Sequence, residues 1–203
     1  MKIAVYQEWY TTQKVKNKMN NISFKAQFIN NTTVRARNEN GKYIDKSIAV
    51  VKMNPNSKLD YNSVQDISQL WGDEETYVKS MLNHYNIIVE DQKRSIYIVT
   101  EQSDNFRKLL PEKVLGMIEV SKYNNFSRID FIQTKPQHAY KSRKRNYKNI
   151  GWAMLSLTER IYGDKKIILN SVRKAVEFYK KYGFVVSYEK CNNPLMTLKR
   201  AKV

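Results

Sequence analysis

The 203-residue sequence predicts a fold of the α+β class, and three observations lead to that prediction. Apolar and polar residues alternate, as in half-buried strands, in segments of residues 22–53 and 95–134. Apolar residues recur at helical spacing in windows of residues 63–85 and 150–161. Gly and Pro are few and dispersed, so no interdomain linker separates these elements.

The first strands belong to the N-terminal part of the chain. From Ile22 the sequence alternates, reaches the turn residues Asn30-Asn31 and alternates again, which predicts a β-hairpin. A second turn precedes residues 43–53, a longer predicted strand. We therefore expect residues 1–42 to form a β-hairpin extension and residues 43–203 to form the main domain.

Two helices and three strands are predicted next. Ser63 is the predicted start of the first helix, because Asp66 stands at its capping-box position. Three acidic residues at the start of the second helix complement its dipole. Its apolar stripe is Val78, Met81, Leu82 and Tyr85. The strands that follow are predicted at residues 95–101, 113–121 and 128–134.

The C-terminal third contains the most strongly periodic helix. Its predicted start is Asn149 or Ile150, and its apolar face comprises Ile150, Met154, Leu157 and Ile161. A strand at residues 165–172, a short helix ending before Gly183 and strands at residues 185–190 and 195–200 are predicted after it. From residue 47 the element order is therefore β-α-α-β-β-β-α-β-α-β-β.

Charge and composition limit the classes of partner. The net charge is +17, with 36 Lys and Arg against 19 acids, which favours polyanionic partners; Lys and Asn enrichment from genome composition is the alternative explanation. One Cys excludes an internal disulfide framework, and two His with one Cys give no zinc spacing, so we expect no metal. No apolar run approaches the ~18 residues that span a bilayer, and we expect a cytoplasmic protein.

The start of the periodic helix is a candidate anion site. A strand and a basic loop lead into it, and Gly151 lies in its first turn. The first N–H groups of a helix have no intrahelical partner and, together with the helix dipole, favour an anion such as a phosphate. An ordinary helix start is the alternative interpretation of Gly151.

Two motifs resemble those of one enzyme family. The run Lys148-Asn149-Ile150-Gly151-Trp152-Ala153 resembles the (Gln/Arg)-x-x-Gly-x-(Gly/Ala) pyrophosphate signature of the GNAT acyl-CoA N-acetyltransferases. Residues Ala175–Phe184 resemble the family's second motif, A-x-x-x-Y-x-x-x-G-F. The resemblance implies a mixed, mostly antiparallel sheet that is flanked by helices and split between the fourth and fifth strands of the domain.

The same resemblance implies the site residues and acetyl-CoA as cosubstrate. Backbone groups of the strand would pair with the pantetheine arm and donate to the thioester oxygen, and the helix start would hold the pyrophosphate. The implied cofactor-binding residues are Phe131, Ile132, Gln133, Thr134, Lys148, Asn149, Ile150, Gly151, Trp152 and Ala153. Tyr179 matches the tyrosine that protonates the departing thiolate in many relatives; the alternative is that it only belongs to a buried stripe.

Some residues depart from the family pattern. Lys148 replaces Gln or Arg, and Val172 stands where many members have an Asn near the pantetheine arm. Gln133 occupies a strand position where many relatives have a Glu, so no general base is evident. Glu119 and Asp130 lie on strands beside the expected split, and we expect each to form a structural salt bridge.

The function expected from these features is transfer of an acetyl group from acetyl-CoA to a primary amine by direct attack in a ternary complex. One alternative is a toxin-like or phage-encoded member that acts on a nucleic-acid-linked amine such as aminoacyl-tRNA, which the charge and the basic loop with Tyr140 and Tyr147 suggest. Another is a non-catalytic module that binds CoA or a partner. The sequence does not identify the acceptor, and a dimer is compatible with it.

Overall fold

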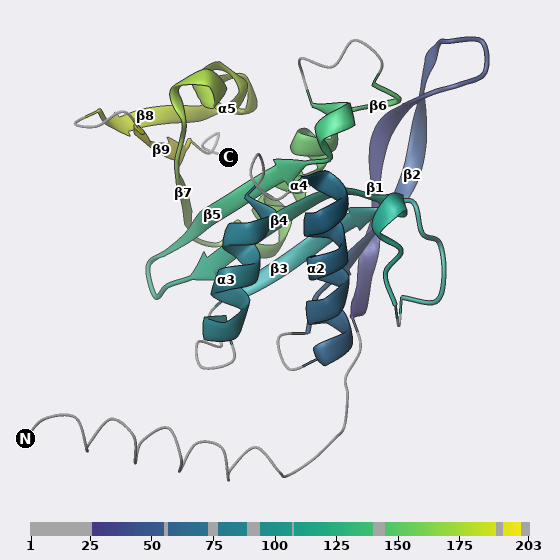
Figure 1. Cartoon of the computed structure of the whole chain (residues 1–203). Coiled ribbons are helices and arrows are strands. Elements are labelled where there is room, and N and C mark those ends of the chain that lie inside the picture. The colour runs from purple at the N-terminus through teal and green to yellow at the C-terminus, as the bar shows by residue number, and fades with distance from the viewer. Residues whose placement is uncertain are drawn as a thin grey trace, which may run out of the picture.

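A computed structural model describes residues 26–54, 57–72, 77–88, 94–106, 108–139, 145–189 and 193–199. Within these residues, one nine-stranded sheet has the order β6-β1-β2-β3-β4-β5-β7-β9-β8 (Figure 1). The strands are β1 (Gln27–Arg37), β2 (Tyr43–Lys52), β3 (Arg94–Thr100), β4 (Val114–Lys122), β5 (Phe126–Thr134), β6 (Tyr147–Lys148), β7 (Lys166–Asn170), β8 (Phe184–Tyr188) and β9 (Leu195–Leu198). The α-helices are α2 (Lys58–Trp71), α3 (Val78–Ile88), α4 (Ile150–Tyr162) and α5 (Val176–Tyr182).

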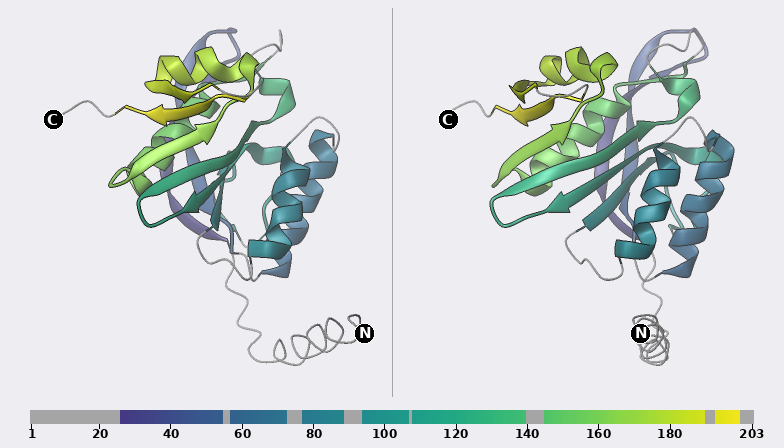
Figure 2. Two further views of the ribbon diagram at one scale, coloured as in Figure 1. Left: turned by 90° about the vertical axis from the view of Figure 1, so that its left-hand side faces the viewer. Right: turned by 60° about the vertical axis from the view of Figure 1, so that its left-hand side comes forward.

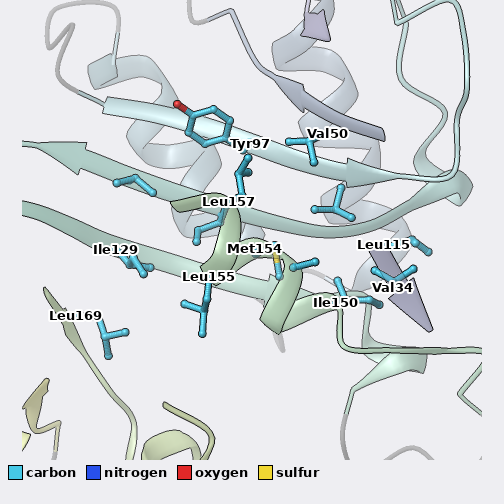
Figure 3. Close-up of a cluster of buried hydrophobic side chains, with 14 of the residues drawn as sticks. Val34, Val50, Tyr97, Leu115, Ile129, Ile150, Met154, Leu155, Leu157 and Leu169 are labelled. Atoms are coloured by element: carbon cyan, nitrogen blue, oxygen red, sulfur yellow. The ribbon is translucent and has the colours of Figure 1, made fainter. Parts of the chain in front are cut away.

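Helices cover both faces of the sheet. Helices α2 and α3 lie on one face, where Val64, Ile67, Val78 and Met81 are buried in one apolar cluster with strand residues. Helix α4 lies on the other face, and its Met154 and neighbours pack among side chains of β1 to β5 and β7 (Figure 3). The strands contribute to both clusters because successive side chains of a strand point to opposite faces.

The sheet is antiparallel except between β5 and β7, which pair in parallel. That pairing joins Phe126–Ile129 to Lys166–Leu169, whereas β5 continues to Thr134. In Figure 2 the two strands meet at one end and diverge toward the other. The sheet is therefore mixed, mostly antiparallel and split beside the second half of β5, which confirms the predicted fold class.

The hairpin predicted with a turn at Asn30-Asn31 is wrong. These residues lie inside the single strand β1, opposite Val50 and Ala49 of β2, with a register shift between Phe28 and Asn30. Pairing with β2 satisfies the backbone groups along the strand, so it outweighs the local turn preference of the two asparagines. Strand β1 therefore belongs to the common sheet.

The predicted start of α2 at Ser63 is also wrong, because the helix begins at Lys58. Ser57 is its N-cap and accepts a hydrogen bond from the Asp60 N–H at 3.3 Å. Ser57 and Asp60 form the capping arrangement that was predicted for Ser63 and Asp66, six residues later in the sequence. Ser63 lies inside the helix, where its hydroxyl donates to the Leu59 carbonyl. In the described ranges, no helix is long and apolar enough to cross a membrane.

Candidate active site

A cavity of about 180 Å³ lies where β5 and β7 separate. Five segments line it: residues 129–132 of β5, the end of β7 with Val172 after it, α5 through Tyr179, Tyr77 just before α3, and Asn193 just before β9. The ladder between β5 and β7 ends at Ile129 and Leu169, so β7 does not pair with the second half of β5. Of the predicted cofactor-binding residues, Phe131 and Ile132 line the cavity.

The predicted β5 segment also contains a bulge. Val120 pairs with Ile129 and Glu119 pairs with Phe131, so Asp130 is the extra residue. A bulge redirects the strand and the groups beside it. Gln133 and Thr134 lie beyond the cavity lining, and the Gln133 amide donates to the Thr134 carbonyl at 2.8 Å.

The predicted anion site at the start of α4 lies outside the lining of this cavity. The first helical hydrogen bond runs from the Ala153 N–H to the Asn149 carbonyl at 2.9 Å. The N–H groups of Ile150, Gly151 and Trp152 precede that bond, so the helix itself does not use them. Asn149 adopts the left-handed conformation, with φ of 65°, and within the described residues its side chain forms no capping hydrogen bond. Residues 148–153, here called the anion turn, therefore have the helix-start geometry that suits an anion.

Gly151 has a packing role that the sequence did not reveal. A Cβ atom at this position would lie 2.8 Å from Cζ of Phe178, on α5. The glycine therefore lets α5 approach the first turn of α4, which brings the helix carrying Tyr179 next to the anion turn. Trp152 is 42% exposed, and its ring lies 4.9 Å from that of Tyr182.

Lys148, the cation at the head of the first motif, lies over an aromatic ring. Its ammonium nitrogen is 3.7 Å from the ring centroid of Tyr43, which belongs to β2. A cation over a ring face is held by the ring quadrupole. The structure therefore joins the anion turn to a strand about a hundred residues away in the sequence.

Tyr179 lines the cavity and also packs in the core. Its ring contacts Phe178 and Phe184, with centroids 5.1 and 5.7 Å away, and the residue is 6% exposed. Burial, reinforced by Tyr77, raises the pKa of the Tyr179 phenol well above its ordinary value. The phenol therefore stays protonated at neutral pH and can donate a proton.

The two acids beside the split have different environments. The Asp130 carboxylate accepts hydrogen bonds from Arg128 and Ser121, which confirms the expected salt bridge. Glu119 is fully buried, and burial together with the charge of Asp130 raises its pKa to about 7. The positive charges of Arg94 and Arg128 act in the opposite direction and lower the pKa of Glu119.

Sequence reasoning missed five residues of the cavity wall: Tyr77, Ile129, Leu169, Asn170 and Asn193. The Tyr77 ring lies 5.7 Å from that of Phe131, a contact between α3 and β5 that no local pattern encodes. Tyr140, Arg143 and Lys144 of the basic loop lie outside the described residues. The described part of the chain contains no group of three or more His, Cys, Asp or Glu that could hold a metal ion.

No protein-family model matches the sequence, and a comparison with curated proteins finds no similar sequence. Solved structures do match. The PaiA N-acetyltransferase from Thermoplasma acidophilum, in complex with coenzyme A, aligns with a TM-score of 0.51 and 19% identity over 76% of this chain and 100% of that one. A protein from Lactobacillus plantarum described as an N-acetyltransferase aligns with a TM-score of 0.50 and 12% identity over 74% and 97% of the two chains. The chain therefore has the fold of the GNAT N-acetyltransferases.

Proposed function

We propose that the protein is an acetyl-CoA-dependent N-acetyltransferase whose site is the cavity between β5 and β7. One observation carries the proposal: β5 parts from β7 beside a cavity that Tyr179 lines, and the helix that carries Tyr179 packs through Phe178 against Gly151 in the first turn of α4. Each motif by itself predicts only local structure, whereas together they would supply a groove, an anion site and an acid.

The residues present fit coenzyme A. The edge of β5 from Asp130 to Thr134 offers backbone donors and acceptors to a pantetheine arm, which carries amide groups of its own. The anion turn offers N–H groups to a pyrophosphate. Val172 lies at the cavity and is 41% exposed, so the side chain there contributes apolar contact.

Acetyl-CoA supplies an activated acyl thioester. In the proposed reaction the nitrogen of a neutral amine forms a bond to the acyl carbon while the carbon–sulfur bond breaks. The Tyr179 hydroxyl gives its proton to the departing sulfur, the proton lost by the amine passes to water, and the Tyr179 phenolate takes a proton back from water before the next turnover. The N–H groups of the bulged β5 strand stabilise the negative charge that develops on the acyl oxygen.

Incubation with isotopically labelled acetyl-CoA tests this function. The protein would be mixed separately with small primary amines, bulk and aminoacylated tRNA, and a protein extract, and the products analysed by mass spectrometry. We expect label on an amine of one class and an equal yield of free CoA. Binding of CoA without transfer to any class would instead favour a non-catalytic binding module, and absence of binding would contradict the proposal.

A nucleic-acid-linked amine is a second candidate acceptor, because of the charge near the site. Arg35 and Arg37 are exposed on β1 and Lys42 in the turn before β2, and β1 pairs with the strand that leads into the anion turn. Exposed cations attract polyanions over long distances at low salt. Label in the tRNA fraction that is lost when salt is raised would select this acceptor, and label in small amines alone would exclude it.

A further inference from the structure

The hairpin formed by β1 and β2 holds the segment that leads into the anion turn. In that segment, residues 145–149, β6 pairs antiparallel with β1 through Arg35 with Lys148 and Ala36 with Tyr147. The Arg37 N–H also donates to the Asn146 carbonyl at 2.8 Å. Figure 1 shows β6 beside this hairpin. The backbone of the segment is thus fixed by a strand from the N-terminal end of the described chain.

Tyr43 contacts the segment at two points. Its hydroxyl donates to the Arg145 carbonyl at 2.8 Å, and its ring lies under the ammonium of Lys148. The Tyr43 side chain therefore holds both Arg145, the first residue of the segment, and Lys148, the cation that begins the first motif.

A second set of contacts holds the middle of the segment. The Tyr147 hydroxyl is hydrogen-bonded to the Glu101 carboxylate and accepts a hydrogen bond from the Lys46 ammonium at 3.1 Å. Lys46 and Glu101 form an ion pair of 2.8 Å. Tyr147 is 8% exposed, so this network anchors it against β2 and the end of β3.

Resting on the proposed function, we propose that Tyr43 is a positioning residue for the cofactor. It fixes the approach to Asn149, whose left-handed conformation sets the direction of the free α4 N–H groups, and it restricts Lys148 to one place beside the pyrophosphate site. It touches no reacting atom. Its loss therefore weakens cofactor binding and leaves the rate of the chemical step unchanged at saturating acetyl-CoA.

Calorimetric titration with CoA tests this role on Tyr43→Leu, Tyr43→Phe, Lys148→Gln and the Tyr43→Leu/Lys148→Gln double variant. We expect Tyr43→Leu to raise the Kd about tenfold and Tyr43→Phe, which keeps the ring, to raise it less. We also expect Tyr43→Leu to weaken binding less when Lys148 is already Gln, because the ring then has no ammonium to hold. Tyr188→Leu, at an exposed position of β8, is the matched control and keeps the parent Kd.

Equal Kd values for the parent, Tyr43→Leu and Tyr43→Phe would overturn the inference while leaving the proposed function intact. Additive losses from Tyr43→Leu and Lys148→Gln would overturn it too, because a merely structural tyrosine would show no coupling to Lys148. If Tyr43→Leu does not fold, Tyr43→Phe with its hydroxyl contact removed decides the question. A parent protein that binds no CoA would refute the proposed function itself, and the inference with it.

Discussion

In the proposed function, Tyr179 serves packing and chemistry together. Its ring contacts Phe178 and Phe184, and the residue lines the cavity between β5 and β7, where its phenol would protonate the leaving thiolate. Tyr179→Phe keeps the ring and removes the proton. We expect a fall in turnover of about 10²-fold with little change in Tm or CoA affinity, measured on an identified acceptor with chemistry rate-limiting.

Tyr182→Phe on the same helix is the control for that experiment. The Tyr182 hydroxyl is bonded to the exposed Glu159 carboxylate at 2.9 Å and does not line the cavity, so its loss should leave turnover unchanged. Full activity in Tyr179→Phe would make Tyr179 a packing residue only. Equal losses in both variants would point to a general effect on α5.

His138 gives the protein a predictable response to acid. Burial, with a contribution from the nearby Lys135 charge, lowers its pKa to about 4, whereas a histidine in the unfolded chain titrates near ~6.5. Between these values, falling pH protonates the unfolded chain but not the folded one, so stability falls as pH drops from about 6.5 to about 4. Stability linked to His138 is fully present above about pH 6.5.

His138→Phe should remove that dependence and keep the edge-on contact with Tyr147, whose ring centroid is 5.1 Å away. Denaturant unfolding across this pH range should show the free energy of unfolding of the variant rising relative to that of the parent as pH falls, by an amount on the order of 1–3 kcal/mol near pH 4. The comparison must be a difference between the two proteins, because the raised pKa of Glu119 changes stability in the opposite direction. Parallel curves for parent and variant would show that His138 does not titrate in this way.

At the scale of elements, hydrophobic periodicity predicts most of the buried face of α4. The α4 stripe is correct at Ile150, Met154 and Leu157, but Ile161 is 37% exposed. Tyr162 is buried in its place, and its hydroxyl lies 2.9 Å from that of Tyr97. Helix α4 ends at Tyr162. The contact with Tyr97 on the sheet therefore determines that the Tyr162 side of the last turn is buried, rather than the Ile161 side.

The close contact between α4 and β4 depends on Gly116. A Cβ atom there would lie 2.8 Å from Cγ2 of Ile150 and 2.9 Å from Cε of Met154. Gly116→Ala should therefore push the start of α4 away from the sheet, and we expect a loss of stability of about 1–3 kcal/mol by denaturant unfolding, together with weaker CoA binding. Unchanged stability would mean that the α4 side chains adjust without cost.

At the scale of the whole molecule, the two motifs predict the parts of the site that are continuous in the sequence. Gly151 lies in the first turn of α4 and Tyr179 on α5, as predicted, because a helix start and a helix stripe are local features. The motifs miss Tyr77 and Tyr43, which reach the site through sheet pairing and helix packing. Those contacts join residues far apart along the chain, so no spacing in the sequence reports them.

The net charge of +17 predicts that cations of the basic loop help to attract polyanionic ligands to the protein. Neutralising Arg143, Lys144 and Arg145 together should weaken binding of CoA or of a nucleic-acid acceptor and flatten its dependence on salt concentration, because fewer cations then attract the polyanion. Binding titrations between low and physiological salt measure both slopes. If the slopes of variant and parent coincide for both ligands, the loop is a solvated surface without a role in binding.

The central claim is that a coenzyme's phosphates bind at the start of α4, and Asn149→Asp tests it most directly. Asp tolerates the left-handed conformation as Asn does, and a carboxylate at a helix start stabilises the helix while repelling a phosphate. Asn149→Gly, which adds no charge, is the control. Calorimetry with CoA should show parent-like binding for Asn149→Gly and a Kd at least roughly tenfold higher for Asn149→Asp, with an unchanged or higher Tm. Equal CoA affinity in Asn149→Asp and the parent, or no CoA binding by the parent, would contradict the account.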